Sequence, residues 1–221
     1  MWQKILDAIN PKNWGVVKFF VTLFGPDITS YYDKKDFDLG VAGIVGGSII
    51  LYRGKDYIQG AIRKITGQWA NHAGIYFGSG KRETVEAMPE GVRKCKMDKD
   101  LDADHQLIVF TKANMTVTEL AMIKGYAYGA CGKKYNVDGV ADFIIDDGKS
   151  DDSTRFCSQL VADAFLSAGI KTSGKEPRKT SPGDIGNYLI SDEAQANGWL
   201  LSDTWNITTA NAIIALKIGV K

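Results

Sequence analysis

HAGIYFGSGKRETVEAM, residues 72–88, carries the clearest structural signal in this chain. It holds two runs rich in β-branched and aromatic residues on either side of a Gly-Ser-Gly turn at 78–80. Such a pattern is typical of a β-hairpin. If the three turn residues form the loop, Phe77 faces Lys81, and the pairing of every other residue in the hairpin follows from that one.

This pairing predicts that His72 lies directly opposite Glu86, with both side chains on one face of the sheet. Opposed β-carbons lie roughly 4.5–5.5 Å apart, so the carboxylate reaches the imidazole ring. The same register places Glu83 opposite Ile75, on the other face. We therefore interpret His72 and Glu86 as a base and its orienting partner, the arrangement that nucleophilic catalysis requires.

A second segment, STRFCSQLVADAF at 153–165, predicts a helix that ends just before Gly169. Ser153 or Thr154 is expected to cap its N-terminus, because a hydroxyl side chain accepts a hydrogen bond from the first helical N–H groups. Cys157 then falls in the first turn of the helix.

A thiol at that position is a candidate nucleophile. A helix N-terminus and a protonated histidine both favour the thiolate, and the free N–H groups of the first turn can bind an oxyanion. Three plainer interpretations stay open: Cys157 as a small buried apolar residue, His72 as a core histidine bound to a carbonyl, and Glu86 as a surface charge paired with an arginine. The other histidine, His105, is interpreted as the first residue of a strand.

Further segments complete an α+β pattern, in which an antiparallel sheet packs against helices that are separate from it in the sequence. Predicted strands lie at 47–54, 91–97, 105–113, 198–203 and 211–220. Predicted helices lie at 55–66 and at 116–134, the second capped by Thr116 or Thr118, and a short helix follows the turn that begins at Thr180.

We place a boundary near residue 38, which separates an N-terminal extension, 1–38, from a domain at 39–221. The extension is interpreted as a helical flap on the domain, and a docking role toward a partner or a membrane surface through the apolar residues 14–24 stays open. It lacks the pattern of a secretory signal peptide. No apolar run reaches the ~20 residues that a membrane span needs. Action outside the producing cell would therefore require another route of delivery.

The composition argues against several classes of function. A net charge of +1, from 27 basic and 26 acidic residues, does not indicate a nucleic-acid binder. Three widely spaced cysteines make a poor disulfide framework and fit a reducing compartment with free thiols. No Cys/His pair has zinc-ligand spacing, and the aspartates of 98–104 do not match a calcium loop. We expect no metal site and no cofactor.

Four segments in this order resemble the circularly permuted, YiiX/YebB-like NlpC/P60 group of papain-like cysteine hydrolases. They are GSIILYRG, WANHAGIYFGSGKRETVEAMPEGVR, FCSQLVADAFLSAGI and TSPGDI, which together span about residues 46–190. As in that group, the histidine strand precedes the cysteine helix. The resemblance implies a permuted papain-like fold, with Cys157 as the nucleophile, His72 as the general base and Glu86 as the third polar residue.

The resemblance also implies contacts with a substrate. Tyr135 resembles a tyrosine that supplies a hydroxyl to the site in this superfamily, and we expect Trp69 and Ser158 to contact the substrate as well. For Tyr135 and Trp69 a packing role in the core stays open. Ser48 stands where the family often has aspartate, at a position that is not catalytic.

The implied reaction is hydrolysis or transfer at an amide or ester bond through an acyl-enzyme. The preferred substrate is a peptidoglycan stem peptide, cut by a phage lysis or virion protein, or by an antibacterial effector delivered from the cytoplasm to the periplasm or cell wall. Candidate protein partners are an immunity or inhibitor protein and a virion component.

Two alternatives to this function stay open: a lipid acyltransferase or phospholipase of the lecithin-retinol-acyltransferase type, and a non-enzymatic virion or binding protein with the same fold. The lipid group typically has a second histidine where Glu86 stands and an asparagine where Phe156 stands. Both differences favour the peptidase or amidase.

Overall fold

The computed structural model describes residues 44–54, 66–78, 82–97, 106–136 and 153–205, together with residues 207, 211, 213, 216 and 217. The predicted extension, 1–38, lies outside these residues, as do the acidic run at 98–104, His105 and all but the last residue of the predicted helix at 55–66. Among the described helices, none is long and apolar enough to cross a membrane.

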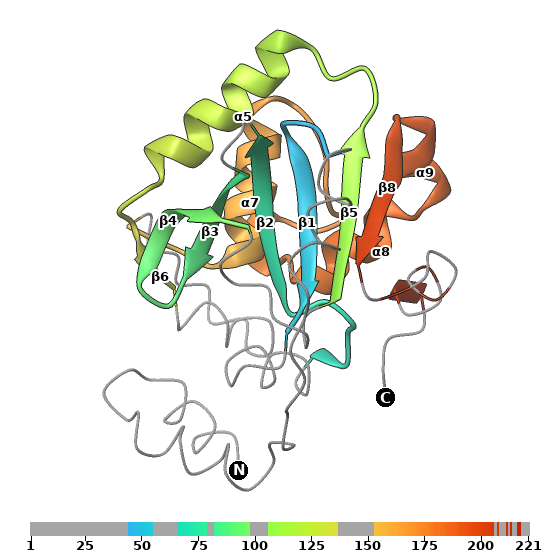
Figure 1. The fold of residues 1–221 in the computed structure, drawn as a ribbon, viewed down its shortest axis with the longest axis horizontal. Helices are drawn as coiled ribbons and strands as arrows, with labels where there is room; N and C mark the ends of the chain where they lie inside the picture. Colours follow the sequence, from blue (N-terminus) through green and yellow to red (C-terminus); the bar gives the residue numbers. More distant parts are fainter. Residues whose placement is uncertain are drawn as a thin grey trace, which may run out of the picture.

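A six-stranded antiparallel sheet forms the centre of the fold, with the strand order β4-β3-β2-β1-β5-β8 (Figure 1). The strands are β1 (Ser48–Arg53), β2 (His72–Gly78), β3 (Glu83–Met88), β4 (Gly91–Lys96), β5 (Gln106–Lys112) and β8 (Trp199–Trp205). Strands β2 and β3 form the hairpin that the sequence predicted, and it lies beside β1 near the middle of the sheet.

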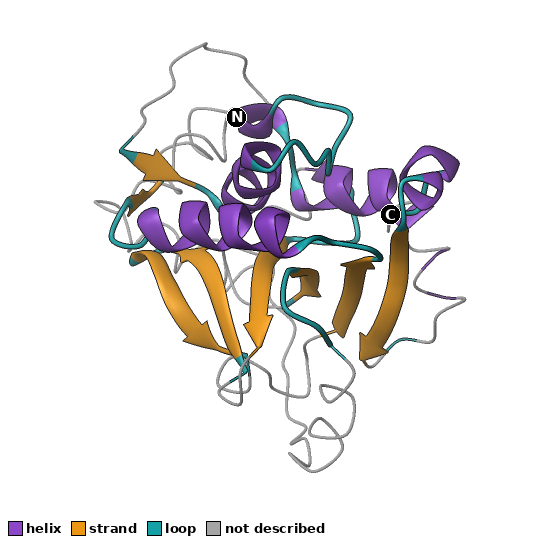
Figure 2. Ribbon diagram, turned by 90° about the horizontal axis from the view of Figure 1, so that it is seen from above, coloured by secondary structure: helices purple, strands orange, loops and turns teal. Residues whose placement is uncertain are grey.

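The helices cover one face of this sheet (Figure 2). They are α5 (Val117–Gly129), α7 (Cys157–Ser167), α8 (Pro182–Leu189) and α9 (Asp192–Ala196), with a short 3-10 turn, η2 (Pro177–Lys179). Two short strands, β6 (Lys134–Tyr135) and β7 (Thr154–Arg155), pair in parallel just before α7. An antiparallel sheet with helices on one side confirms the predicted α+β class.

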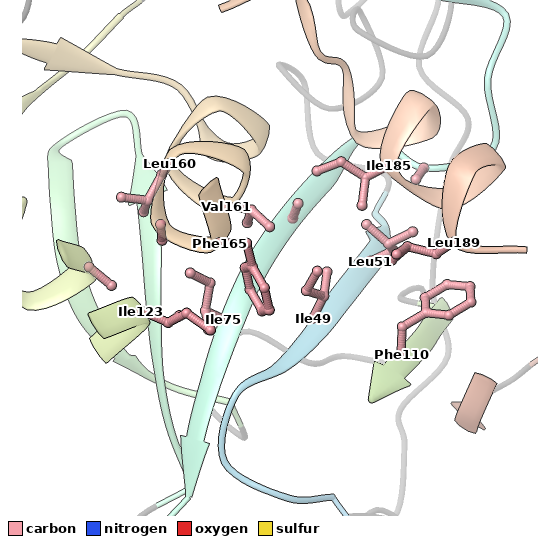
Figure 3. Close-up of a cluster of buried hydrophobic side chains, with 14 of the residues drawn as sticks. Ile49, Leu51, Ile75, Phe110, Ile123, Leu160, Val161, Phe165, Ile185 and Leu189 are labelled. Atoms are coloured by element: carbon pink, nitrogen blue, oxygen red, sulfur yellow. The ribbon is translucent and has the colours of Figure 1, made fainter. Parts of the chain in front are cut away.

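Helix α7 packs on the sheet through an apolar stripe (Figure 3). Leu160, Val161 and Phe165 recur at helical spacing and join a buried cluster with sheet residues such as Ile49 and Ile75. Burying this stripe fixes how α7 lies on the sheet, and therefore where the first residue of the helix is placed.

Helix boundaries differ from the prediction in two places. Thr116 caps α5 in a capping box with Glu119, as expected, but the helix ends at Gly129 rather than near 134. The chain then turns through Gly132, which has φ of +92°, a conformation that glycine adopts without strain. The N-cap of α7 is Phe156 rather than Ser153 or Thr154, because Thr154 belongs to strand β7.

The predicted strand at 211–220 is wrong. The described residues of this segment, 211, 213, 216 and 217, are helical. A short apolar run does not by itself distinguish a strand from a buried helix. Leu216 lies in the main core and close to Gly186 of α8.

The packing of α7 generates a prediction about stability. Phe165 is fully buried, and its ring lies 5.4 Å from that of Trp199 between centroids. Phe165→Ala should therefore lower the free energy of unfolding by about 3–5 kcal/mol, because it leaves a cavity in the core. The neighbouring Leu166 is exposed, so Leu166→Ala should change it by less than about 0.5 kcal/mol. Urea unfolding of both variants checks this, and equal losses of stability would contradict the described packing.

Candidate active site

The histidine and glutamate of the hairpin are in direct contact. His72 is the first residue of β2, and its Nε2 lies 2.7 Å from Oε2 of Glu86 on β3. The two residues expose only 6% and 3% of their surfaces. A buried charge is costly unless it is paired and hydrogen-bonded, so this contact determines the charge of both groups.

Glu86 reaches His72 diagonally across the ladder rather than from directly opposite. Its partner on β2 is Gly74, so the predicted pairing of His72 with Glu86 is wrong by two residues. A shift of two residues keeps both side chains on the same face. A β-carbon on Gly74 would lie 2.8 Å from Cγ of Glu86, so the absence of a side chain at Gly74 leaves the space that the glutamate crosses.

The shift in register comes mainly from the connection between the two strands. Gly78 pairs with Glu83 and not Ile75 with Glu83 as predicted, so four residues, 79–82, connect the strands in place of the expected three. A bulge between Tyr76 and Gly78, where φ of Gly78 is +71°, then moves the pairing back by one residue. Glu83 accepts a hydrogen bond from the hydroxyl of Tyr128 on α5, so its carboxylate is paired.

Cys157 is the first residue of α7 and exposes 2% of its surface. The N-cap residue, Phe156, supplies no side-chain hydrogen bond to the helix, and the first turn carries no acidic residue. The N–H groups of this turn therefore receive no side-chain cap, and they impose a positive potential on the sulfur. A helix end of this kind favours a thiolate and can bind an oxyanion.

The thiol meets the imidazole at a point where two strands separate. The ladder between β2 and β3 ends at Gly74 and Glu86, whereas β2 continues to pair with β1 as far as His72, and β3 with β4 as far as Met88. Helix α7 packs against both β2 and β3. At this end Cys157 lies close enough to His72 to raise the pKa of the imidazole. Nε2 of the ring faces Glu86, so Nδ1 is the nitrogen that can face the sulfur.

The contacts of His72 favour the protonated ring. Burial, the largest influence, lowers its pKa, but the charge and hydrogen bond of Cys157, followed by the hydrogen bond and charge of Glu86, raise it. Together they place the pKa of His72 well above its ordinary value of 6.5. Burial raises the pKa of Glu86, but its contacts with His72 and with two hydroxyl groups outweigh burial and lower that pKa.

Those two hydroxyls belong to residues that the sequence did not indicate. Tyr52 of β1 donates to Oε1 of Glu86 at 2.9 Å, and Thr84 of β3 donates to the same oxygen at 2.6 Å. The alternation in Thr84-Val85-Glu86 places the threonine and glutamate on one face, which is a signal that could have identified Thr84. Tyr52 could not be identified in this way, because it reaches Glu86 only through the pairing of β1 with β2.

The turn before α7 is fixed by a second polar cluster that sequence reasoning missed. Arg155 of β7 forms an ion pair with Asp163 of α7 at 3.0 Å, and its guanidinium donates to the hydroxyl of Tyr126 on α5 at 3.2 Å. Tyr126 in turn donates to Asp163 at 3.1 Å. These bonds join β7, α5 and α7 on either side of Cys157 and limit the positions that the sulfur can take.

The residues expected to contact a substrate occupy structural positions in this conformation. Trp69 is buried in the main core, and Tyr135 of β6 is half-buried and packs against the same cluster. Ser158 is fully buried and donates to the carbonyl of Thr180 at 2.7 Å, which ties α7 to the segment before α8. Their contact with a substrate remains a prediction.

Within the described ranges, no group of three or more His, Cys, Asp or Glu side chains is arranged to hold a metal ion. In this part of the chain, Cys95, Cys131 and Cys157 form no disulfide bond. Cys157 is the one that raises the pKa of His72.

Comparison with known proteins finds a family that this chain matches. Residues 44–187, well over half of the chain, match the family model described as "Permuted papain-like amidase enzyme, YaeF/YiiX, C92 family". Among solved structures, the crystal structure of metalloprotein YiiX from Escherichia coli O157:H7 is similar, at 15% identity and a TM-score of 0.48, covering 77% of this chain and 92% of that one. No curated protein shows a significant match. The family match confirms the predicted permuted papain-like fold.

The diagonal contact of Glu86 generates a prediction at Gly74. Gly74→Ala places a methyl group where Glu86 passes, which should displace the carboxylate from His72. Alkylation of Cys157 by iodoacetamide should then slow severalfold, because the imidazolium beside the sulfur loses the carboxylate that stabilises it. Peptide mass spectrometry separates Cys157 from the other two cysteines.

The matched control is Gly125→Ala on α5, where a β-carbon meets nothing within 4 Å. This variant should alkylate at the wild-type rate. If Gly74→Ala does so as well while remaining folded, the glycine is not what allows Glu86 to reach the histidine.

Proposed function

Because the chain belongs to the C92 family of permuted papain-like amidases, we propose that it is a cysteine hydrolase that cleaves an amide bond through an acyl-enzyme. The observation that carries the proposal is the position of His72, whose Nε2 contacts Glu86 and whose pKa is raised by the neighbouring Cys157. This is the arrangement of nucleophile, base and orienting group that acyl transfer through a thiol requires.

In the first half of the reaction, the thiolate of Cys157 attacks the carbonyl carbon of the substrate. The oxyanion that forms is bound by N–H groups of the first turn of α7. The imidazolium of His72 gives its Nδ1 proton to the leaving nitrogen, the carbon–nitrogen bond breaks, and a thioester with Cys157 remains. Glu86 holds the ring through Nε2 and stays ionised.

In the second half, neutral His72 removes a proton from a water molecule, and the resulting hydroxide attacks the thioester. The carbon–sulfur bond breaks and releases a carboxylic acid. The sulfur leaves as a thiolate, and the imidazolium is restored by the proton taken from water. The site therefore returns to its starting state with no other reactant than water.

Peptidoglycan stem peptides are the substrate that we propose. Two features favour a peptide over a lipid substrate. The third polar group is the carboxylate of Glu86, which contacts Nε2 of His72, whereas the lipid-acting group typically has a second histidine there. Cys157 follows Phe156, whereas that group typically has an asparagine before the cysteine. The low exposure of Cys157 also favours a slender, extended chain over the surface of a folded protein.

Digestion of purified peptidoglycan tests this function. The wild-type protein should release fragments with new amino and carboxyl ends, detected by mass spectrometry, and Cys157→Ala should release none because it lacks the nucleophile. Cys131→Ala is the matched control, since Cys131 is half-buried and its thiol donates to the backbone carbonyl of Ala127 on α5 at 3.7 Å. It should retain wild-type activity.

Other outcomes of this experiment would redirect the proposal. Release of fatty acid from phospholipid vesicles, with intact peptidoglycan, would assign the site to a lipid substrate. Identical fragments from wild type and Cys157→Ala would show that Cys157 is not the nucleophile, and would contradict the proposed cysteine hydrolase.

The charge of Glu86 generates a prediction about pH. His72 must keep its proton to protonate the leaving nitrogen, so kcat/KM should fall as the pH rises through the raised pKa of His72. Glu86→Gln keeps the shape of the side chain but removes its charge, which lowers that pKa. The alkaline limit of the profile should then move to lower pH by about one unit or more. An unchanged limit would show that the glutamate acts only as a spacer.

A further inference from the structure

The Glu86 carboxylate receives more hydrogen bonds than the orientation of His72 requires. Its Oε2 contacts the ring of His72, and its Oε1 accepts from both Tyr52 and Thr84. An ionised carboxylate only accepts hydrogen bonds, so each hydroxyl must direct its proton at the glutamate. Both donors are buried, at 4% exposure for Tyr52 and none for Thr84.

Strand register brings these groups together. Tyr52 of β1 lies directly opposite His72 of β2, and Thr84 precedes Glu86 by two positions on β3, so all four side chains occur on one face. The ring of Tyr52 also contacts the ring of His72, with centroids 5.2 Å apart and planes tilted by 41°. Tyr52 therefore contacts both Glu86 and His72.

We propose that Tyr52 and Thr84 are positioning residues that hold Glu86 ionised and turned toward His72, and thereby keep the ring of His72 protonated beside Cys157. This rests on the proposed function, in which Cys157 and His72 react as an ion pair. A buried carboxylate without such donors tends to take up a proton. A neutral Glu86 would still orient the ring but would no longer stabilise its positive charge.

Other charged and titratable groups near this face do not replace the two hydroxyls. Arg93 of β4 lies opposite Glu86, but its half-exposed guanidinium is 3.7 Å from Glu90. Tyr76 follows on the same face of β2, and burial raises its pKa, so it stays neutral. From α7 the group that faces His72 is Cys157 itself.

The test follows the nitrogen NMR signals of the His72 ring as a function of pH, which needs no substrate. In the wild type, the ring should lose its proton at a pH well above that of an ordinary histidine. Tyr52→Phe and Thr84→Val each remove one donor. Each should move this midpoint down by roughly 0.5–1 pH unit, and the double variant should move it further.

Two matched variants distinguish positioning from general packing. Thr84→Ser keeps the hydroxyl and should keep the wild-type midpoint. Tyr188→Phe removes a tyrosine hydroxyl that donates to another carboxylate, Glu193, at 3.2 Å on the far side of the sheet from Glu86, and should leave the midpoint of His72 unchanged. If Thr84→Val does not fold, Tyr52→Phe compared with Tyr188→Phe decides the question alone.

The outcomes separate this inference from the proposed function. A wild-type midpoint near that of an ordinary histidine would contradict the ion pair itself. A raised wild-type midpoint that is unchanged in Tyr52→Phe and in the folded double variant would overturn the positioning role and leave the proposed hydrolase intact.

Discussion

The hydrogen bond between Glu86 and His72 is the contact on which the site depends, because it places a negative charge beside a ring that burial would otherwise keep neutral. The contact requires an empty position at Gly74, over which the glutamate passes. Glu86 and His72 are each too buried to carry a charge alone, so their two charges stabilise one another. Removing either one alters the charge of the other.

Each part of the fold contributes a specific position to this cluster. The register of β1, β2 and β3 brings Tyr52, His72 and Glu86 to one face, and the end of the β2–β3 ladder leaves room for a residue from the helical side. The apolar stripe of α7 fixes how the helix lies on the sheet, and the ion pair of Arg155 with Asp163 fixes the turn that precedes it. The sulfur consequently reaches the imidazole from a helix packed on the opposite face.

Local sequence patterns predicted the hairpin, the cysteine near a helix start and the shared face of the histidine and glutamate, since each depends on neighbouring residues. The register could not be predicted, because the strands are connected by four residues in place of the three of the Gly-Ser-Gly turn, and a bulge between Tyr76 and Gly78 changes the pairing again. Tyr52 was missed because its role arises from strand pairing across the sheet. The helical segment at 211–217 was predicted as a strand, because a short apolar run fits either structure.

The protonation of His72 is the central claim, and nitrogen NMR of the imidazole measures it directly. The chain has only two histidines, so a His105→Gln variant assigns the signals. The account predicts that both ring nitrogens of His72 still carry protons at about pH 7.5, a unit above the ordinary histidine pKa. It also predicts that Cys157→Ala lowers the pH at which the ring loses its proton. A His72 ring that titrates near pH 6.5 in the wild type, or is neutral throughout, would contradict the account.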